Sequence, residues 1–385
     1  MIQVRERSTL LLAELLARLP KLPLSDASAC RFATFFSSRL GDYPSVVPAL
    51  KALTSLLKNH ATALLVGNGG ASTAAPTAAA PAAAGGGEVA AMDESDKGTA
   101  AARGAAGASA AVGAKGTAAE AIAKGVFEEL HLPALSQSIR QAALSVLLAL
   151  VADPGLMEAL SAGMGKAFVT GLVGSLEGEK DPRCLIVGLL ALRKTQKGFD
   201  AAVLAETSEA VFDATACYFP VTFTPPPNDP HNISPDALRT GLESVLVGSP
   251  GMAPHVLPML LDKLSSEVST AKEASLKALV AGVRAFGAPG VGMHLRAIGG
   301  AMFEEAVHGA DPDLASLALL SLTDVAKETA SHALLTGLGD KCQEWRALVQ
   351  PLLEGAVAEV AGNQPCSVVG RGSGRVLLVS RRRRV

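Results

Sequence analysis

Residues Leu257–Leu279 read Leu-Pro-Met-Leu-Leu-Asp-Lys-Leu-Ser-Ser-Glu-Val-Ser-Thr-Ala-Lys-Glu-Ala-Ser-Leu-Lys-Ala-Leu. The leucine-rich beginning predicts a helix, and the polar residues that follow it predict a short turn. Ser269 then stands where an N-cap is expected, ahead of a second run with apolar residues at helical spacing. This pattern predicts two helices joined by a turn. One such pair cannot bury its apolar faces alone, so we expect neighbouring pairs to stack against it.

The starts of the predicted second helices recur at a nearly constant spacing. From Ser138 to Asp181 is 43 positions, and from Asp181 to Ser269 is 88, or two steps of 44. A further 42 positions lead to Asp311. Helical repeats of the HEAT and armadillo type have a period of about 40–47 residues. The sequence therefore predicts an all-α fold, a HEAT/armadillo-type helical-repeat solenoid.

The segment from Gly67 to about Glu120 consists mostly of Ala, Gly, Ser, Thr and Pro. Such a composition cannot bury enough apolar surface to offset the entropy lost when the chain becomes ordered. The 94 positions between Pro44 and Ser138 also fall to about one repeat once some fifty residues are set aside. We therefore predict a disordered Ala/Gly-rich insertion within the solenoid.

These observations divide the chain into four predicted parts. They are N-terminal HEAT helices (1–66), the disordered insertion (67–120), a HEAT-repeat solenoid (121–362) with a Pro-rich loop (218–233), and a disordered basic tail (363–385). The tail contains four consecutive arginines, Arg381–Arg384. This tetrad is open to three interpretations: a nuclear-import signal, a phosphate-binding patch, or a tail without function.

Three dipeptides share one helix-start signal. Asp181-Pro182, Ser234-Pro235 and Asp311-Pro312 each place an N-cap side chain before a proline at the first helical position. Apolar stripes follow two of these starts, and both are predicted to face a core. The stripes consist of Leu238, Leu242, Val245 and Leu246, and of Leu314, Leu317, Leu320 and Leu322.

Composition excludes several classes of protein. The net charge of −2 provides no global attraction to nucleic acid or to an anionic membrane. No uninterrupted apolar run reaches the roughly 20 residues that span a bilayer. The five cysteines are an odd number and form no Cys-x-x-Cys pair, which argues against a disulfide framework or zinc ribbon and favours a reducing compartment.

The sequence contains no recognisable catalytic constellation. It has no Gly-x-x-x-x-Gly-Lys-Ser/Thr phosphate loop, no His-Glu-x-x-His and no Gly-x-Ser-x-Gly. None of the seven histidines pairs with Cys or Asp at metal-ligand spacing on one helix face. We therefore predict a protein that is not an enzyme and that binds no cofactor or metal directly.

The stretch Tyr218–Pro230 reads Tyr-Phe-Pro-Val-Thr-Phe-Thr-Pro-Pro-Pro-Asn-Asp-Pro and is the most unusual part of the chain. Because proline fixes φ and removes a backbone donor, we predict an extended loop between helices near 200–217 and 234–248. The skipped step of the repeat falls near Pro225, so the loop is predicted to be an insertion within one repeat.

This loop provides the candidate protein-binding residues. In one interpretation Tyr218 and Phe219 pack back onto the helices, while Phe223 to Asp229 present a partner surface. In the other, the loop is a rigid plug that seals the gap between repeats. The candidate residues are Tyr218, Phe219, Phe223, Pro225, Pro226, Pro227, Asn228 and Asp229.

Together with its flanks, the loop carries a family resemblance. With Gly178–Arg183 before it and Leu257–Leu264 after it, the region resembles the methyl-methanesulfonate-sensitivity family of nucleotide-excision-repair proteins, in its N-terminal portion. The resemblance implies a HEAT-repeat adaptor of the cytosolic iron–sulfur assembly machinery, working in the cytoplasm and nucleus. The family's C-terminal repeats, which dock that machinery, are expected to be missing here.

The implied partners are a β-propeller assembly protein, a small assembly factor, and apo iron–sulfur clients of DNA repair, replication and transcription. The resemblance implies that these partners handle the clusters. The cysteines agree, since they are at least 24 positions apart and a solenoid repeat touches only its neighbours. The alternative is a generic HEAT-repeat or importin-like transport scaffold, which would need acidic inner helices bearing Trp, whereas this chain has one Trp.

Overall fold

The computed structural model describes residues 2–21, 23–65, 116–225 and 233–335. Within these ranges the regular structure is helical, and no β-strand occurs. The described chain divides into two compact units at Ser249 and Pro250. The bulk of the predicted insertion, the predicted tail and the end of the last predicted repeat lie outside the described residues.

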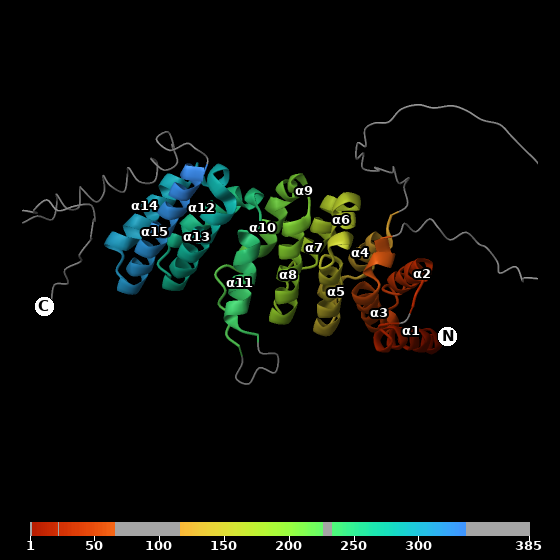
Figure 1. The fold of residues 1–385 in the computed structure, drawn as a ribbon. Helices are drawn as coiled ribbons and strands as arrows, with labels where there is room; N and C mark the ends of the chain where they lie inside the picture. The colour runs from red at the N-terminus through yellow and green to blue at the C-terminus, as the bar shows by residue number, and fades with distance from the viewer. Residues whose placement is uncertain (1, 22, 66–115, 226–232, 336–385) are drawn as a thin grey trace, which may run out of the picture. The chain divides into compact units, whose positions relative to one another are not determined.

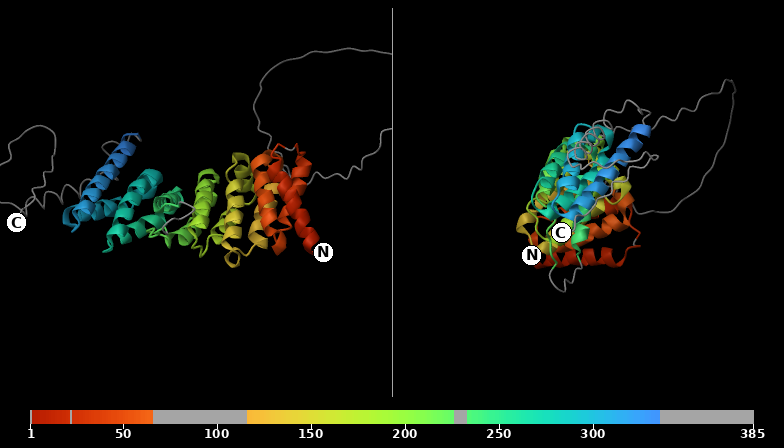
Figure 2. Two further views of the ribbon diagram at one scale, coloured as in Figure 1. Left: turned by 90° about the horizontal axis from the view of Figure 1, so that it is seen from below. Right: turned by 90° about the vertical axis from the view of Figure 1, so that its left-hand side faces the viewer.

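Unit 1, up to Ser249, is built from two rows of helices (Figure 1). Consecutive members of the first row contact one another, and the view from below keeps their order (Figure 2). The first row consists of α3 (Val46–Asn59), α5 (Gln137–Leu150), α8 (Pro182–Gly198) and α11 (Pro235–Leu246), and α1 (Ile2–Arg18) packs on α3. The second row consists of α2 (Asp26–Ser37), α4 (Ala118–Glu129), α6 (Pro154–Gly163), α7 (Gly165–Gly174), α9 (Ala201–Glu206) and α10 (Ser208–Ala216).

Unit 2 repeats this arrangement. Helix α12 (Ala253–Leu264) packs on α13 (Ser269–Val291), α14 (Leu295–His308) packs on α15 (Pro312–Leu335), and α13 packs on α15. Helix α13 contains a kink at Gly287, whose φ of 63° lies in the left-handed region that glycine tolerates. The predicted all-α helical-repeat solenoid is therefore confirmed, and the pair read from residues 257–279 is α12 and the beginning of α13.

The three predicted helix starts are confirmed, each with a proline in the first turn. Asp181 accepts a hydrogen bond from the Arg183 N–H at 2.9 Å, and Ser234 accepts one from the Ala237 N–H at 3.0 Å. Asp311 accepts one from the Asp313 N–H at 2.9 Å. Each bond satisfies a backbone donor that the first helical turn leaves unpaired.

Only one of the two predicted stripes is right throughout. Leu238, Leu242, Val245 and Leu246 are all buried. In α15, however, Leu320 is 65% exposed, and the buried positions after Leu314 are Ala318, Ser321, Leu322, Val325 and Thr329. Small Ala318 and Ser321 continue the 3.6-residue period, and the leucine-only pattern overlooked them.

Helices on both sides of residues 66–115 belong to unit 1, because α2 contacts α4 and α3 contacts α5. The end of the insertion, predicted at about Glu120, is too late, since α4 begins at Ala118. A capping box begins this helix: Thr117 Oγ1 accepts from the Glu120 N–H at 3.2 Å, and Glu120 Oε1 accepts from the Thr117 N–H at 3.3 Å.

Replacing Thr117 by alanine is expected to destabilise unit 1 by about 1 kcal/mol, because the Glu120 N–H loses its acceptor at the helix start. Hydrogen exchange of the α4 amides in the whole chain measures this change. Thr323→Ala is the matched control, since this exposed threonine lies inside α15 and its hydroxyl bonds only to the Leu319 carbonyl oxygen of the same helix. Equal exchange of α4 in Thr117→Ala and the unmodified chain would show that the capping box contributes nothing.

No single described helix is long and apolar enough to cross a bilayer, and two pairs of consecutive helices reach that length and composition only jointly.

Candidate protein-binding site

The turn between α7 and α8 forms the base of the candidate site. Gly178 in this turn has a φ of 69°, a left-handed conformation that a side chain at this position would strain. The next residue, Glu179, points its side chain inward and is only 4% exposed there. Asp181 then caps α8, and its carboxylate also binds the Arg183 guanidinium at 2.7 Å.

The Glu179 carboxylate is held from several sides. Arg140 of α5 donates to it through Nε at 2.7 Å and through Nη2 at 3.0 Å, and the Lys180 and Asp181 N–H groups each donate at 2.9 Å. Burial acts to raise the pKa of the Glu179 carboxyl, but the hydrogen bonds from Arg140 and the backbone outweigh it, so the pKa lies below its usual value. Glu179 is therefore a buried carboxylate that joins α5 to the turn before α8.

Tyr218 attaches the Pro-rich loop to this same turn. Its hydroxyl group lies 2.8 Å from the Glu179 carbonyl oxygen and 3.3 Å from that of Leu176, and it donates to them. The backbone N–H of Phe219 donates to the Ala216 carbonyl oxygen at 3.0 Å, which ends α10 in a turn. The loop therefore leaves α10 with its first aromatic side chain fastened to the preceding repeat.

After Phe219 the chain is extended and runs beside α8 and α11. A groove of about 280 Å³ lies between these three segments. Its walls are mainly apolar, with the exposed Lys180 at the rim. The lining comprises Lys180, Pro182, Leu185, Leu189, Cys217, Tyr218, Pro220, Val221, Thr222, Phe223, Leu238 and Leu242.

The sequence-predicted residues fall into three groups. Tyr218 and Phe219 are half-buried at the base of the loop, and the hydrogen bonds of Tyr218 agree with packing back onto the helices. Phe223 and Pro225 are half-buried, and Phe223 lines the groove while Thr222 and Thr224 are exposed. Pro226, Pro227, Asn228 and Asp229 lie outside the described residues. Binding of a partner by this loop therefore stays a prediction.

Sequence reasoning missed Arg140, Glu179 and Lys180 as parts of this site. Arg140 and Glu179 are 39 positions apart, and Glu179 and Tyr218 are also 39 apart. That separation is close to one repeat. Polar residues that recur at the repeat period were therefore the signal in the sequence by which these contacts could have been found. The prediction of the loop as an insertion between two helices agrees with its place between α10 and α11.

The described cysteines are not gathered at one place. Cys30 and Cys184 are buried, and Cys217 is exposed at the rim of the groove. Burial raises the pKa of the Cys184 thiol to about 12, so this thiol stays protonated at neutral pH. Within the described ranges, no group of three or more His, Cys, Asp or Glu side chains is arranged to hold a metal ion.

Comparison with known proteins shows which family this chain belongs to. A family model described as "Dos2-interacting transcription regulator of RNA-Pol-II" (MMS19_N) matches residues 2–308. The chain belongs to this family. The family expected from the loop and its flanks is thereby confirmed, and the matched range includes the whole of unit 1 and the groove.

Curated relatives in the MMS19 family are named MMS19 nucleotide excision repair protein homologues. The one from Danio rerio is 41% identical over 120 residues, which are 31% of this chain and 11% of that protein. The human protein is 34% identical over 161 residues, or 42% of this chain and 15% of the relative. The Arabidopsis thaliana protein is 28% identical over 278 residues, or 72% of this chain and 20% of the relative. The chain thus spans between about a tenth and a fifth of the length of these MMS19 relatives.

Replacing Tyr218 by phenylalanine is expected to destabilise unit 1 by about 1–2 kcal/mol, because two backbone carbonyl groups lose their donor. Burial raises the pKa of Tyr218 to about 12. The neutral hydroxyl therefore stabilises the fold fully below about pH 10, the unfolded value, and this contribution is lost as pH rises toward 12.

Urea denaturation of Tyr218→Phe and the unmodified chain, at neutral pH and near pH 11, measures both effects. Tyr43 is 69% exposed and is the other tyrosine of the chain, so Tyr43→Phe is the matched control. A stability difference for Tyr218→Phe that stays constant between the two pH values would contradict the assigned hydrogen bonds.

Proposed function

We propose that this chain is part of a non-enzymatic scaffold of the cytosolic iron–sulfur protein assembly machinery. It holds apo-proteins of DNA repair, replication and transcription while clusters are inserted, and it works in the cytoplasm and nucleus. The match of residues 2–308 to the MMS19 family carries this proposal. The relatives' names connect the family to nucleotide excision repair, in which such clients act.

The groove beside the Pro-rich loop is the proposed contact for a client. Apolar walls from α8, the loop and α11 suit one or two apolar side chains, and Lys180 at the rim suits an acidic neighbour. Tyr218 holds the loop at its base, so a client meets a wall that is already in place. Such preorganisation lowers the entropy lost on binding.

The remaining partners in this proposal are a β-propeller assembly protein and a small assembly factor. Clusters stay with these partners and pass to the client, and the chain itself ligates none. Scattered cysteines support this division, because a cluster needs several converging thiolates. The raised pKa of Cys184 supports it as well, since a ligand must be a thiolate.

Binding of a purified apo iron–sulfur helicase of DNA repair tests the proposal, with the chain immobilised and the helicase in solution. Phe223→Ala and Lys180→Glu are expected to weaken binding by about tenfold each, while Lys166→Glu on α7 leaves it within about twofold. All three variants must keep the helical circular dichroism of the parent. Equal binding by all four chains, or no binding by the parent, would overturn the assignment of the groove.

Anaerobic reconstitution with iron and sulfide tests separately whether the chain itself ligates a cluster. The chain is expected to remain colourless after desalting. Stoichiometric iron and a cluster absorption band would instead identify it as a cluster carrier.

A further inference from the structure

The two rows of helices in unit 1 differ in charge. In the first row, α3, α5 and α8 together contain seven basic residues and no acidic one, whereas α11 at the end of the row contains Asp236, Arg239 and Glu243. The six helices of the second row contain eight acidic and three basic residues. The seven basic residues are Lys51, Lys58, Arg140, Arg183, Arg193, Lys194 and Lys197.

Four of these seven cations are already engaged within the protein. Lys51 pairs with Glu14 of α1, and Arg140 and Arg183 pair with Glu179 and Asp181. Arg193 donates to the carbonyl oxygen of Gly248 at 3.0 Å. The other three form no ion pair with any residue in the described ranges, and all three are exposed: Lys58, Lys194 and Lys197.

An exposed apolar side chain stands beside the lysines of α8. Leu190, Lys194 and Lys197 follow one another at i, i+4 and i+7, so they share one face of the helix. Leu190 is 46% exposed. Helix α3 carries a comparable stripe, in which Val47 is 56% exposed and Lys58 lies at the end.

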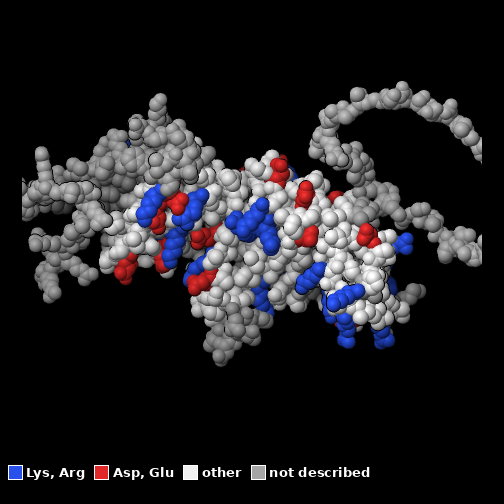
Figure 3. Space-filling view, in the orientation of Figure 1, with Lys and Arg blue, Asp and Glu red and all other residues white. Residues whose placement is uncertain are grey.

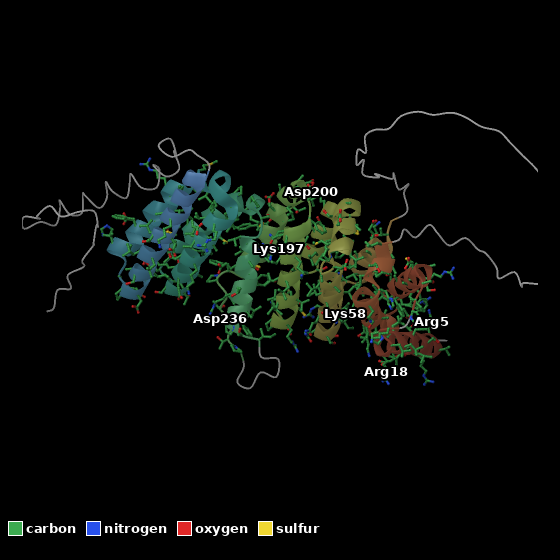
Figure 4. The ribbon with its side chains drawn as sticks, viewed as in Figure 1. Arg5, Arg18, Lys58, Lys197, Asp200 and Asp236 are labelled. Carbon is green, nitrogen blue, oxygen red and sulfur yellow. The ribbon has the colours of Figure 1, made fainter. Side chains whose placement is uncertain are left out.

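Helix α5 packs between α3 and α8. Its one charged residue, Arg140, is half-buried and paired with Glu179, whereas Ser138 is exposed. Gln141, Ser145 and Leu148 are half-buried and share one face of the helix with Ser138. Lys58 and Lys197 appear on the same side of unit 1 (Figure 4), and the surface between the groups of cations on that side is mostly uncharged, with an acidic side chain beside it (Figure 3). The result is a surface with cations at both margins and mainly uncharged side chains in the middle.

We propose that this α3–α5–α8 surface binds an acidic protein segment in which leucine-like side chains are spaced among Asp and Glu. Lysines at the margins attract the carboxylates, and exposed Leu190 offers contact to the apolar side chains. Nucleic acid fits the surface less well. Three free lysines neutralise few phosphates, and none of the three helices contributes an aromatic side chain for base stacking.

This inference does not rest on the iron–sulfur role. The surface is formed by other residues than the groove beside the Pro-rich loop, and its test uses synthetic peptides in place of an iron–sulfur client. A negative result for either proposal therefore leaves the other standing.

The probe is a fluorescein-labelled synthetic peptide with Leu at every fourth position among Glu, Asp and Ser. Fluorescence anisotropy with the whole chain measures its Kd. Replacing Lys58, Lys194 and Lys197 together by Gln is expected to weaken binding by about tenfold or more, and added salt weakens binding to the parent chain. The matched control replaces Lys124, Lys166 and Lys263 by Gln, which changes net charge equally elsewhere, and it is expected to stay within about twofold of the parent.

Three comparisons decide the chemistry of the partner. A peptide with Lys in place of Glu and Asp is expected not to bind. A peptide with Ser in place of Leu is expected to bind more weakly than the parent peptide. Replacing Leu190 of the protein by Ser is expected to reduce the difference in Kd between these two peptides. The proposal is overturned when both triple variants weaken binding equally, when the leucines of the peptide have no effect, or when a single-stranded DNA oligonucleotide of equal charge binds more tightly and displaces the peptide.

Discussion

Replacing Phe168 by alanine is expected to destabilise unit 1 by about 3–5 kcal/mol, the range for truncating a fully buried aromatic side chain. Phe168 is fully buried in α7. Its ring lies edge-on to that of Phe127 with centroids 5.6 Å apart, and 5.4 Å from the ring centroid of Phe199. Alanine would leave a cavity between three helical segments and remove both aromatic contacts.

Hydrogen exchange in the whole chain localises this loss. Amides of α4 and α7 are expected to exchange faster, while those of α12 to α15 in unit 2 provide an internal reference that does not change. Leu11→Ala is the control for truncation as such, because Leu11 is 61% exposed on α1. A loss below about 1 kcal/mol for Phe168→Ala would show that neighbouring side chains refill the space.

Replacing Arg140 by methionine is expected to cost about 3–5 kcal/mol, because it leaves the Glu179 carboxylate buried without its cation. The side chains of Glu179 and Arg140 are 4% and 21% exposed, so water replaces the lost hydrogen bonds poorly. Lys166→Met is the matched control. Its ion pair with Glu206 is exposed on both sides, at 60% and 57%, and its removal is expected to cost less than about 1 kcal/mol.

The same ion pair predicts a dependence on pH. The pKa of Glu179 is lowered in the folded chain, so the carboxylate contributes its stability above the unfolded value of about 4.3. That contribution is lost as pH falls through the folded value. Glu179→Gln does not titrate, so the stability difference between it and the unmodified chain is expected to shrink below about pH 4. A difference that stays constant from pH 7 to pH 3 would contradict the assigned state of Glu179.

Local chemistry explains why the helix starts were predictable. Asp181, Ser234 and Asp311 cap the helices that follow them through atoms two or three residues away. Such bonds depend on neighbouring residues alone, so a sequence pattern suffices to find them. The capping box at Thr117 is equally local. It was not predicted because Thr117 lies at the end of the Ala/Gly-rich segment, which was assigned to the disordered insertion as a whole.

The repeat period was predictable over the chain, and the one irregular step could be recognised from the loop. Asp181 and Ser269 are 88 positions apart, and the midpoint falls near Pro225, inside the predicted insertion. Helix α11 begins at Pro235, as Ser234-Pro235 predicted, so the first step is longer and the second shorter. The extra residues form the loop and leave the spacing of the later repeats intact. Stacking sets where α11 packs on α8, and the loop length adapts to it.

By itself the sequence determined the helical repeat, three helix caps, the buried stripe of α11 and the family, because each depends on residues that are close together or evenly spaced. The tertiary structure alone decided which repeats touch. It placed Arg140 against Glu179 and Tyr218 against the turn before α8, each across 39 positions. It also put the acid-free helices α3, α5 and α8 into one row. Long-range pairing depends on how helices stack, and no local pattern specifies which polar side chains then meet.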